Sequence, residues 1–132
     1  MRLEESIRPR FAPERILLIE DDFMLRANLA ELLMSEGYQV SCAADGVEAL
    51  LRLVREPLPA AIILDIVLPK VNGISFRQRQ MAVPELSQIP TIALTAMKNL
   101  GDLDHLGFRH VLPKPTNIDH LFEALAQLGS PS

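Results

Sequence analysis

The sequence contains almost nothing that would assign it to a specialised class of protein. Its 132 residues include one cysteine, Cys42, and no tryptophan. A lone cysteine cannot close an internal disulfide, so the composition excludes a disulfide-stabilised scaffold and suits a reducing compartment. No apolar run approaches the roughly 20 residues that a helix needs to cross a bilayer. Because the charged N-terminus also lacks the apolar segment of a signal peptide, we expect a cytoplasmic protein without a membrane partner.

The charge balance argues against binding to nucleic acid. The chain has 13 lysine and arginine residues against 17 aspartate and glutamate residues, for a formal net charge of −4. A protein of this charge has no general attraction to phosphate backbones. With 48% hydrophobic residues, the composition is that of an ordinary globular protein. We expect residues 1–13 to form a flexible arm and residues 14–129 to form a single domain.

Short apolar stretches of strand length alternate with segments in which apolar residues recur at helical spacing. The expected strands are residues 15–19, 39–42, 60–64, 91–94 and 110–112. Helices are expected through Leu25, Leu29, Leu32 and Leu33, through Val47, Leu50, Leu51 and Val54 on one face, and over about 74–82, 98–106 and 118–128. This alternation predicts an α/β fold in which a doubly wound, five-stranded parallel sheet lies between helices.

Polar residues follow four of the expected strands near the point where each strand ends. They are Glu20, Asp21 and Asp22 after the first strand, Asp65 after the third, Thr95 after the fourth and Lys114 after the fifth. In a parallel α/β sheet, the carboxyl ends of the strands meet at one edge, where ligands bind. Carboxylates that cluster there repel one another unless a cation lies among them. Mg²⁺ prefers carboxylates, waters and phosphate oxygens, so it suits this set of residues.

The same residues suit phosphoryl transfer. A carboxylate such as Asp65 can act as a nucleophile and become an acyl phosphate. The charge of the transferred group then needs a metal ion on one side and a cation such as Lys114 on the other. A hydroxyl such as that of Thr95 can hold one phosphoryl oxygen.

Four stretches in this order, LLIEDD, AAIILDIVLPKVNG, TIALTA and VLPKP, resemble the receiver domain of two-component response regulators. The resemblance covers about residues 14–128 and implies the flavodoxin-like receiver fold with strand order 2-1-3-4-5. It implies that a sensor histidine kinase or a histidine phosphotransfer protein phosphorylates Asp65. It also makes Thr95 the switching hydroxyl and Lys114 the phosphoryl-binding cation. Such a chain accepts a phosphoryl group and loses it again, and it is not an enzyme with a separate substrate.

The resemblance further implies a metal site and one unusual peptide bond. Mg²⁺ is then held by Glu20, Asp21, Asp65 and the backbone carbonyl of Val67. The bond between Lys114 and Pro115 is expected to be cis, a form that occurs almost only before proline.

Three features depart from the family pattern. Val111 stands three residues before Lys114, where the family usually carries an aromatic residue that moves with the switch threonine. The segment from Thr95 to Lys114 is a few residues shorter than usual, so its helix is expected to be short, displaced or frayed. Pro113 lacks the N–H that a sheet ladder needs, which suits a fifth strand at the edge of the sheet.

Other interpretations of these residues stay open. Asp22 can be simply the N-cap of the next helix. The chain can be a pseudo-receiver that acts as an interaction module without phosphorylation. A Mg²⁺-dependent aspartyl phosphatase is a weaker alternative, because Val67 stands where such enzymes usually carry an acid. The sequence names neither a downstream protein nor an oligomeric state, and a homodimer is one option. Because no output domain follows the receiver, the chain either docks on a partner, passes phosphate along a relay, or is a fragment.

Overall fold

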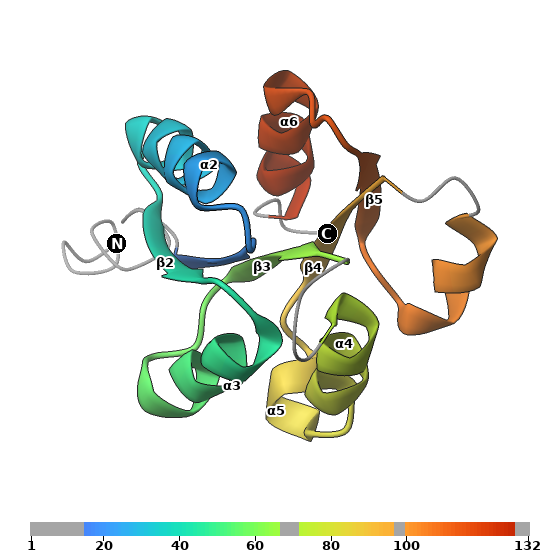
Figure 1. Ribbon diagram of the computed structural model, residues 1–132. Coiled ribbons are helices and arrows are strands. Elements are labelled where there is room, and N and C mark those ends of the chain that lie inside the picture. The colour runs from blue at the N-terminus through green and yellow to red at the C-terminus, as the bar shows by residue number, and fades with distance from the viewer. Residues whose placement is uncertain (1–14, 67–71, 97–99, 129–132) are drawn as a thin grey trace, which may run out of the picture.

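The computed structural model describes residues 15–66, 72–96 and 100–128. Within these ranges the chain forms a five-stranded parallel sheet flanked by helices (Figure 1). The strands are β1 (Arg15–Ile19), β2 (Gln39–Ala43), β3 (Ala61–Asp65), β4 (Thr91–Thr95) and β5 (His110–Pro113). Their order is β2-β1-β3-β4-β5, which confirms the predicted fold and strand order. The order reverses between β1 and β3, which is where a sheet of this type binds its ligands.

The helices form two layers, one on each face of the sheet (Figure 1). α2 (Phe23–Ser35) and α6 (Ile118–Leu128) cover one face. α3 (Gly46–Arg55), α4 (Gly73–Met81), α5 (Pro84–Ser87) and the 3-10 helix η1 (Leu100–Leu106) lie on the other. The four-residue α5 was not predicted from the sequence, although proline is favourable in the first turn of a helix. No helix in the described ranges is both long enough and apolar enough to cross a bilayer.

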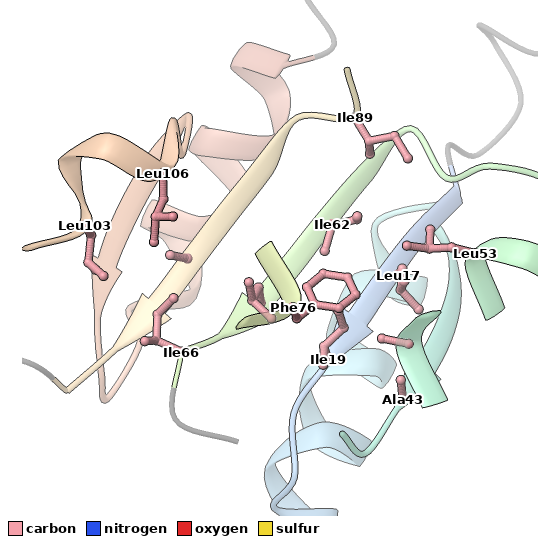
Figure 2. Packing of buried hydrophobic residues seen from close by; sticks show 13 residues of the cluster. Leu17, Ile19, Ala43, Leu53, Ile62, Ile66, Phe76, Ile89, Leu103 and Leu106 are labelled. Atoms are coloured by element: carbon pink, nitrogen blue, oxygen red, sulfur yellow. The ribbon is translucent and has the colours of Figure 1, made fainter. Parts of the chain in front are cut away.

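The central strands are buried between two hydrophobic clusters. Every residue of β3 and β4 is buried, as continuous apolar runs in a parallel sheet require. Figure 2 shows the cluster on the α3 and α4 side, where the ring of Phe76 lies against the sheet beside Leu17 and Ile19. Leu33 of α2 and Leu121 of α6 belong to the cluster on the opposite face. The strand ends that carry the polar residues therefore extend from a packed and rigid sheet.

Side-chain caps determine where the helices that follow β1 and β2 begin. The Asp22 carboxylate accepts the backbone N–H of Leu25 at 3.0 Å, so Asp22 is the N-cap of α2. The Asp45 carboxylate accepts the N–H of Glu48 at 2.8 Å and caps α3 in the same way. Because both helices start directly after a strand, these caps also shape the sheet edge at which the polar residues meet.

Only part of the apolar face that the sequence indicates for α3 packs on the sheet: Leu50 is partly buried against the cluster on that side. The buried residues of this helix are Gly46, Ala49 and Leu53. In contrast, Val47 is 44% exposed and Val54 is 79% exposed. The small Gly46 and Ala49 let the helix pack close to the sheet, so Val47, Leu51 and Val54 lie on the solvent side.

The segment between β4 and β5 contains the 3-10 helix η1, which agrees with the short helix expected there. Arg77 of α4 holds the end of this segment and is itself buried. Its guanidinium donates to the carbonyls of Leu106 at 2.8 Å and Gly107 at 3.1 Å, and to the Thr91 hydroxyl at 3.0 Å. These bonds tie the end of η1 and the start of β4 to α4.

Candidate functional site

The carboxyl ends of β1, β3 and β5 surround a hollow of about 290 Å³. It is lined by Glu20, Asp21, Asp22, Leu25, Asp65, Ala96 and Lys114. Glu20 and Asp21 follow β1, Asp65 is the last residue of β3, and Lys114 follows β5. The structure thus brings together five of the six polar residues that were expected to meet at this edge.

Three carboxylates converge in the hollow. One oxygen each of Glu20, Asp21 and Asp65 lies within 4.8 Å of the other two. Glu20 and Asp65 are buried, with 1% and 3% of their surface exposed, whereas Asp21 is exposed to solvent. This arrangement offers several hard oxygen donors and leaves one side open to water. Such a donor set fits Mg²⁺, which binds through a few carboxylates and keeps several water ligands.

Lys114 supplies a positive charge next to two of these acids. Its Nζ lies 3.1 Å from Asp65 Oδ2 and 3.2 Å from Glu20 Oε1. The backbone N–H of Lys114 donates to the Thr95 carbonyl at 2.9 Å, which fixes the lysine beside the end of β4. Burial lowers the pKa of Lys114, but the hydrogen bond and charge of Asp65, with the charge of Glu20, raise it more. The pKa of Lys114 is therefore above its ordinary value, and the side chain is charged at neutral pH.

Burial raises the pKa of Glu20 from 4.5 to about 7. The backbone N–H of Asp22, 3.2 Å from Glu20 Oε2, lowers this pKa, whereas the negative charge of Asp65 raises it and the positive charge of Lys114 lowers it. The ionised form of Glu20 is thus unfavourable in the free protein. A cation bound in the hollow would favour that ionised form, so the electrostatics agree with the donor set.

Arg26 takes part in the site although the sequence gave no reason to select it. Its Nη1 donates to the Glu20 carbonyl at 2.8 Å and to the Asp21 carbonyl at 3.4 Å. The guanidinium carbon lies 5.5 Å from the centre of the Phe23 ring, which it covers. These contacts hold the backbone that carries the two acids, so Arg26 is a positioning residue. No spacing rule in the sequence selects Arg26, because a long side chain can reach several backbone carbonyls.

Gly73, the first residue of α4, packs against the backbone that carries Asp65. Its N–H donates to the Ile66 carbonyl at 2.8 Å. A Cβ on Gly73 would lie 2.6 Å from the carbonyl oxygens of both Asp65 and Ile66. Because backbone atoms cannot move aside as a flexible side chain can, only glycine fits here, and it sets how closely α4 approaches the end of β3.

Two further predicted site residues, Thr95 and Val67, do not line the hollow as the structure describes it. Thr95 is buried at the end of β4, at the edge of the sheet that carries the hollow. The residue of this segment that lines the hollow is Ala96, not Thr95. Val67, whose backbone carbonyl was predicted to bind the metal, lies outside the described residues.

The features of β5 that depart from the family pattern fit the structure. β5 is the edge strand, so Pro113, which pairs with Thr95, removes no hydrogen bond from the interior of the sheet. Val111 is partly buried and packs against the cluster on the α3 and α4 side. The bond between Lys114 and Pro115 is cis, as the resemblance implied.

Comparison with known proteins gives the family of the chain. The model of the response regulator receiver domain matches residues 16–126. The response regulator MprA of Mycobacterium sp. (strain KMS) is 32% identical over 120 residues, which are 88% of this chain and 50% of MprA. The chain therefore spans about half the length of this relative. The polar-differentiation response regulator DivK of Brucella anthropi is 30% identical over 116 residues, which are 86% of this chain and 94% of DivK.

A solved structure with the same fold contains a magnesium ion. It is the receiver domain of the sensor histidine kinase PA1611 from Pseudomonas aeruginosa, with a magnesium ion coordinated in the active site cleft. That domain is 32% identical to this chain, with a TM-score of 0.81 over 90% of this chain and 100% of that domain. The strand order and the acidic sheet edge place the protein in the receiver class of flavodoxin-like folds. The chain belongs to the response regulator receiver family.

Proposed function

We propose that this receiver domain accepts a phosphoryl group on Asp65 and that the modification changes its binding to a partner protein. The observation that carries the proposal is the pairing of the buried Asp65 carboxylate with Lys114 at 3.1 Å inside the hollow. A carboxylate held beside a fixed cation is positioned to attack an electrophile that enters the hollow.

The proposed donor is a phosphohistidine on a sensor histidine kinase or a histidine phosphotransfer protein. A carboxylate oxygen of Asp65 attacks the phosphorus, the new P–O bond forms, and the P–N bond breaks. The histidine nitrogen leaves with the electron pair. Lys114, already in contact with Asp65, then neutralises part of the charge on the phosphoryl oxygens. Water later hydrolyses the acyl phosphate on the same chain, so the protein does not turn over a separate substrate.

Glu20, Asp21 and Asp65 are the residues proposed to hold Mg²⁺, with the carbonyl of Val67 as a further ligand by family resemblance. Bound there, the ion supplies positive charge toward the phosphoryl oxygens. Support comes from the convergence of the three carboxylates and from the magnesium ion in the related PA1611 domain.

Thr95 is the proposed switching hydroxyl, and the downstream protein is unknown. Thr95 ends β4, and its carbonyl accepts the N–H of Lys114, so the lysine and the threonine are joined through the backbone. A change in the contacts of Lys114 on phosphorylation therefore reaches the edge formed by β4 and β5. Because Val111 stands where the family carries an aromatic residue, we propose that the readout in this chain does not depend on rotation of a ring at that position.

The test is phosphorylation by a small donor, with intact mass as the readout. Wild type incubated with acetyl phosphate and Mg²⁺ should gain the mass of one phosphoryl group, and EDTA should prevent the gain. Asp65→Asn should not gain it, whereas Asp119→Asn, a change at an exposed acid on α6, should behave like wild type. Equal labelling of Asp65→Asn would contradict the proposal. A wild type that never gains the group, yet binds a partner, would favour the pseudo-receiver alternative.

A further inference from the structure

The outward face of α3 is apolar. Val47 and Leu51 are each 44% exposed and Val54 is 79% exposed. Their spacing of four and then three residues places them in one row along the helix. α3 lies at the end of its helical layer, beside the edge strand β2 (Figure 1).

None of these three residues belongs to either hydrophobic cluster of the described part of the chain. α3 is already held on the sheet by Gly46, Ala49 and Leu53, which are buried. A helix that packs on one face of a sheet normally presents polar residues to water. A row of valine and leucine on the solvent side indicates a surface that becomes covered.

Two charged residues flank the row on the same side. Glu48 and Arg55 are seven residues apart, which is almost two full helical turns, so they project from one flank. Glu48 is half-exposed; its Oε1 accepts the backbone N–H of Ala44 at 2.6 Å, and its Oε2 lies 3.6 Å from Arg52 of its own helix. Arg55 is exposed and makes no ion pair with any residue in the described part of the chain.

This pattern is self-complementary in one arrangement only. Two copies of α3 can be related by a two-fold axis perpendicular to both helices, so that they run antiparallel with their apolar rows in contact. Both charged flanks then lie on the same side of the interface. Glu48 near the start of one helix then lies opposite Arg55 near the end of the other. Because of the two-fold symmetry, this charge pair forms twice. In a parallel pair the flanks lie on opposite sides, and neither charge meets a partner.

We infer that the outward face of α3 binds a second copy of this chain in the antiparallel arrangement. The flanking charges favour this occupant over a membrane surface, because Glu48 and Glu56 balance Arg52 and Arg55, whereas helices that bind anionic membranes carry an excess of basic residues. The ten residues of α3 span about 15 Å, so the contact is small. Contacts below about 1,200 Å² are typical of weak and transient association, so the dimer forms at high micromolar concentration.

The interface and the phosphoryl site are separate. None of the residues in the row lines the hollow that holds Asp65. The proposed dimer contact therefore uses residues outside the phosphoryl site, and its test can succeed or fail separately from that of the proposed function.

Sedimentation equilibrium measures the association directly. Wild type should show a monomer–dimer equilibrium, and Val54→Glu should raise the dissociation constant at least about tenfold, because it places charge in the apolar contact. The matched control is Met34→Glu on α2, which changes a side chain that is 52% exposed on the opposite face of the sheet. Met34→Glu should leave the constant unchanged. A wild type that stays monomeric up to about 1 mM, or an equal effect of the two variants, would overturn the inference.

Cysteine cross-linking tests the orientation. With Glu48 opposite Arg55 of the other copy, the two-fold axis passes close to Leu51. In a Cys42→Ala background, Leu51→Cys should form a disulfide-linked dimer rapidly under mild oxidation. Val47→Cys should form it slowly, because the two copies of residue 47 are then about 14 Å apart along the helix axis, whereas in a parallel pair they would face each other. Equal rates would overturn the antiparallel arrangement. If the protein is monomeric and Leu51→Cys reacts slowly, but reacts faster once residues 1–13 are deleted, then those residues cover this face of α3. That result would overturn the inference that a second copy binds there.

Discussion

Replacing Glu20 by glutamine should stabilise the metal-free protein at high pH. The pKa of Glu20 is about 7 in the folded chain, against an ordinary value of 4.5. The folded chain thus holds this proton more tightly than the unfolded chain does. The free energy of unfolding consequently falls as the pH rises from 4.5 to about 7, and the loss is complete above that range. Glutamine keeps the shape of the side chain but cannot ionise, so it avoids this loss.

The size of the effect follows from the two pKa values. Each pH unit between them corresponds to about 1.4 kcal/mol, so ionised Glu20 costs about 3 kcal/mol at about pH 8. We expect Glu20→Gln to be about 2–3 kcal/mol more stable than wild type there, because the pKa of about 7 already includes the attraction of Lys114 for the carboxylate. For a chain of this length the melting temperature should rise by roughly 5–10 °C. At about pH 4.5 the two proteins should differ by less than about 1 kcal/mol.

The assay is thermal unfolding in EDTA across the pH range, followed by circular dichroism. Glu31→Gln on α2 is the matched control, because Glu31 is exposed and distant from the hollow. It should show the pH profile of wild type. Adding Mg²⁺ should raise the melting temperature of wild type more than that of Glu20→Gln. If Glu20→Gln is no more stable than wild type at high pH, or if it is more stable by the same amount at low pH, the inference that ionised Glu20 destabilises the fold is wrong.

Three further predictions follow from individual contacts. Gly73→Ala should destabilise the fold by more than about 2 kcal/mol, because the added Cβ would lie 2.6 Å from backbone oxygens. Urea unfolding measures this change, and an unchanged unfolding midpoint would refute the close contact. Arg26→Gln should weaken Mg²⁺ binding about tenfold, measured by calorimetry, while the fold stays intact. An unchanged affinity for Mg²⁺ would show that Arg26 does not position the two acids. Burial raises the pKa of the Cys42 thiol, so iodoacetamide should modify it more slowly than free cysteine at about pH 8.

The strands and the location of the site were predictable because both depend on local pattern. Continuous apolar runs such as residues 61–64 have one stable place in an α/β domain, between two helical layers. Once the sheet is parallel, Glu20 and Asp65 must meet at the same edge. The distance from Asp65 to Lys114 was not predictable, since it depends on the register between β4 and β5 and on side-chain rotamers.

The orientation of α3 and the role of Arg26 were also beyond the sequence pattern. Helical spacing shows that Val47 and Val54 share a face, but it does not say whether that face meets the sheet or the solvent. The deciding factor was the small size of Gly46 and Ala49, which let the helix pack closely on the opposite side. Arg26 is found only in three dimensions, because a long side chain can reach several backbone carbonyls and no spacing rule selects among them.

The most direct test of the central claim is chemical mapping of the acceptor after reaction with a small donor. Borohydride reduces an aspartyl phosphate to homoserine, which marks the modified residue in a peptide mass spectrum. After treatment with acetyl phosphate and Mg²⁺, homoserine should appear at position 65, and it should be absent when EDTA replaces Mg²⁺. Homoserine at another aspartate, or none at position 65 under any condition, would contradict the account of this site.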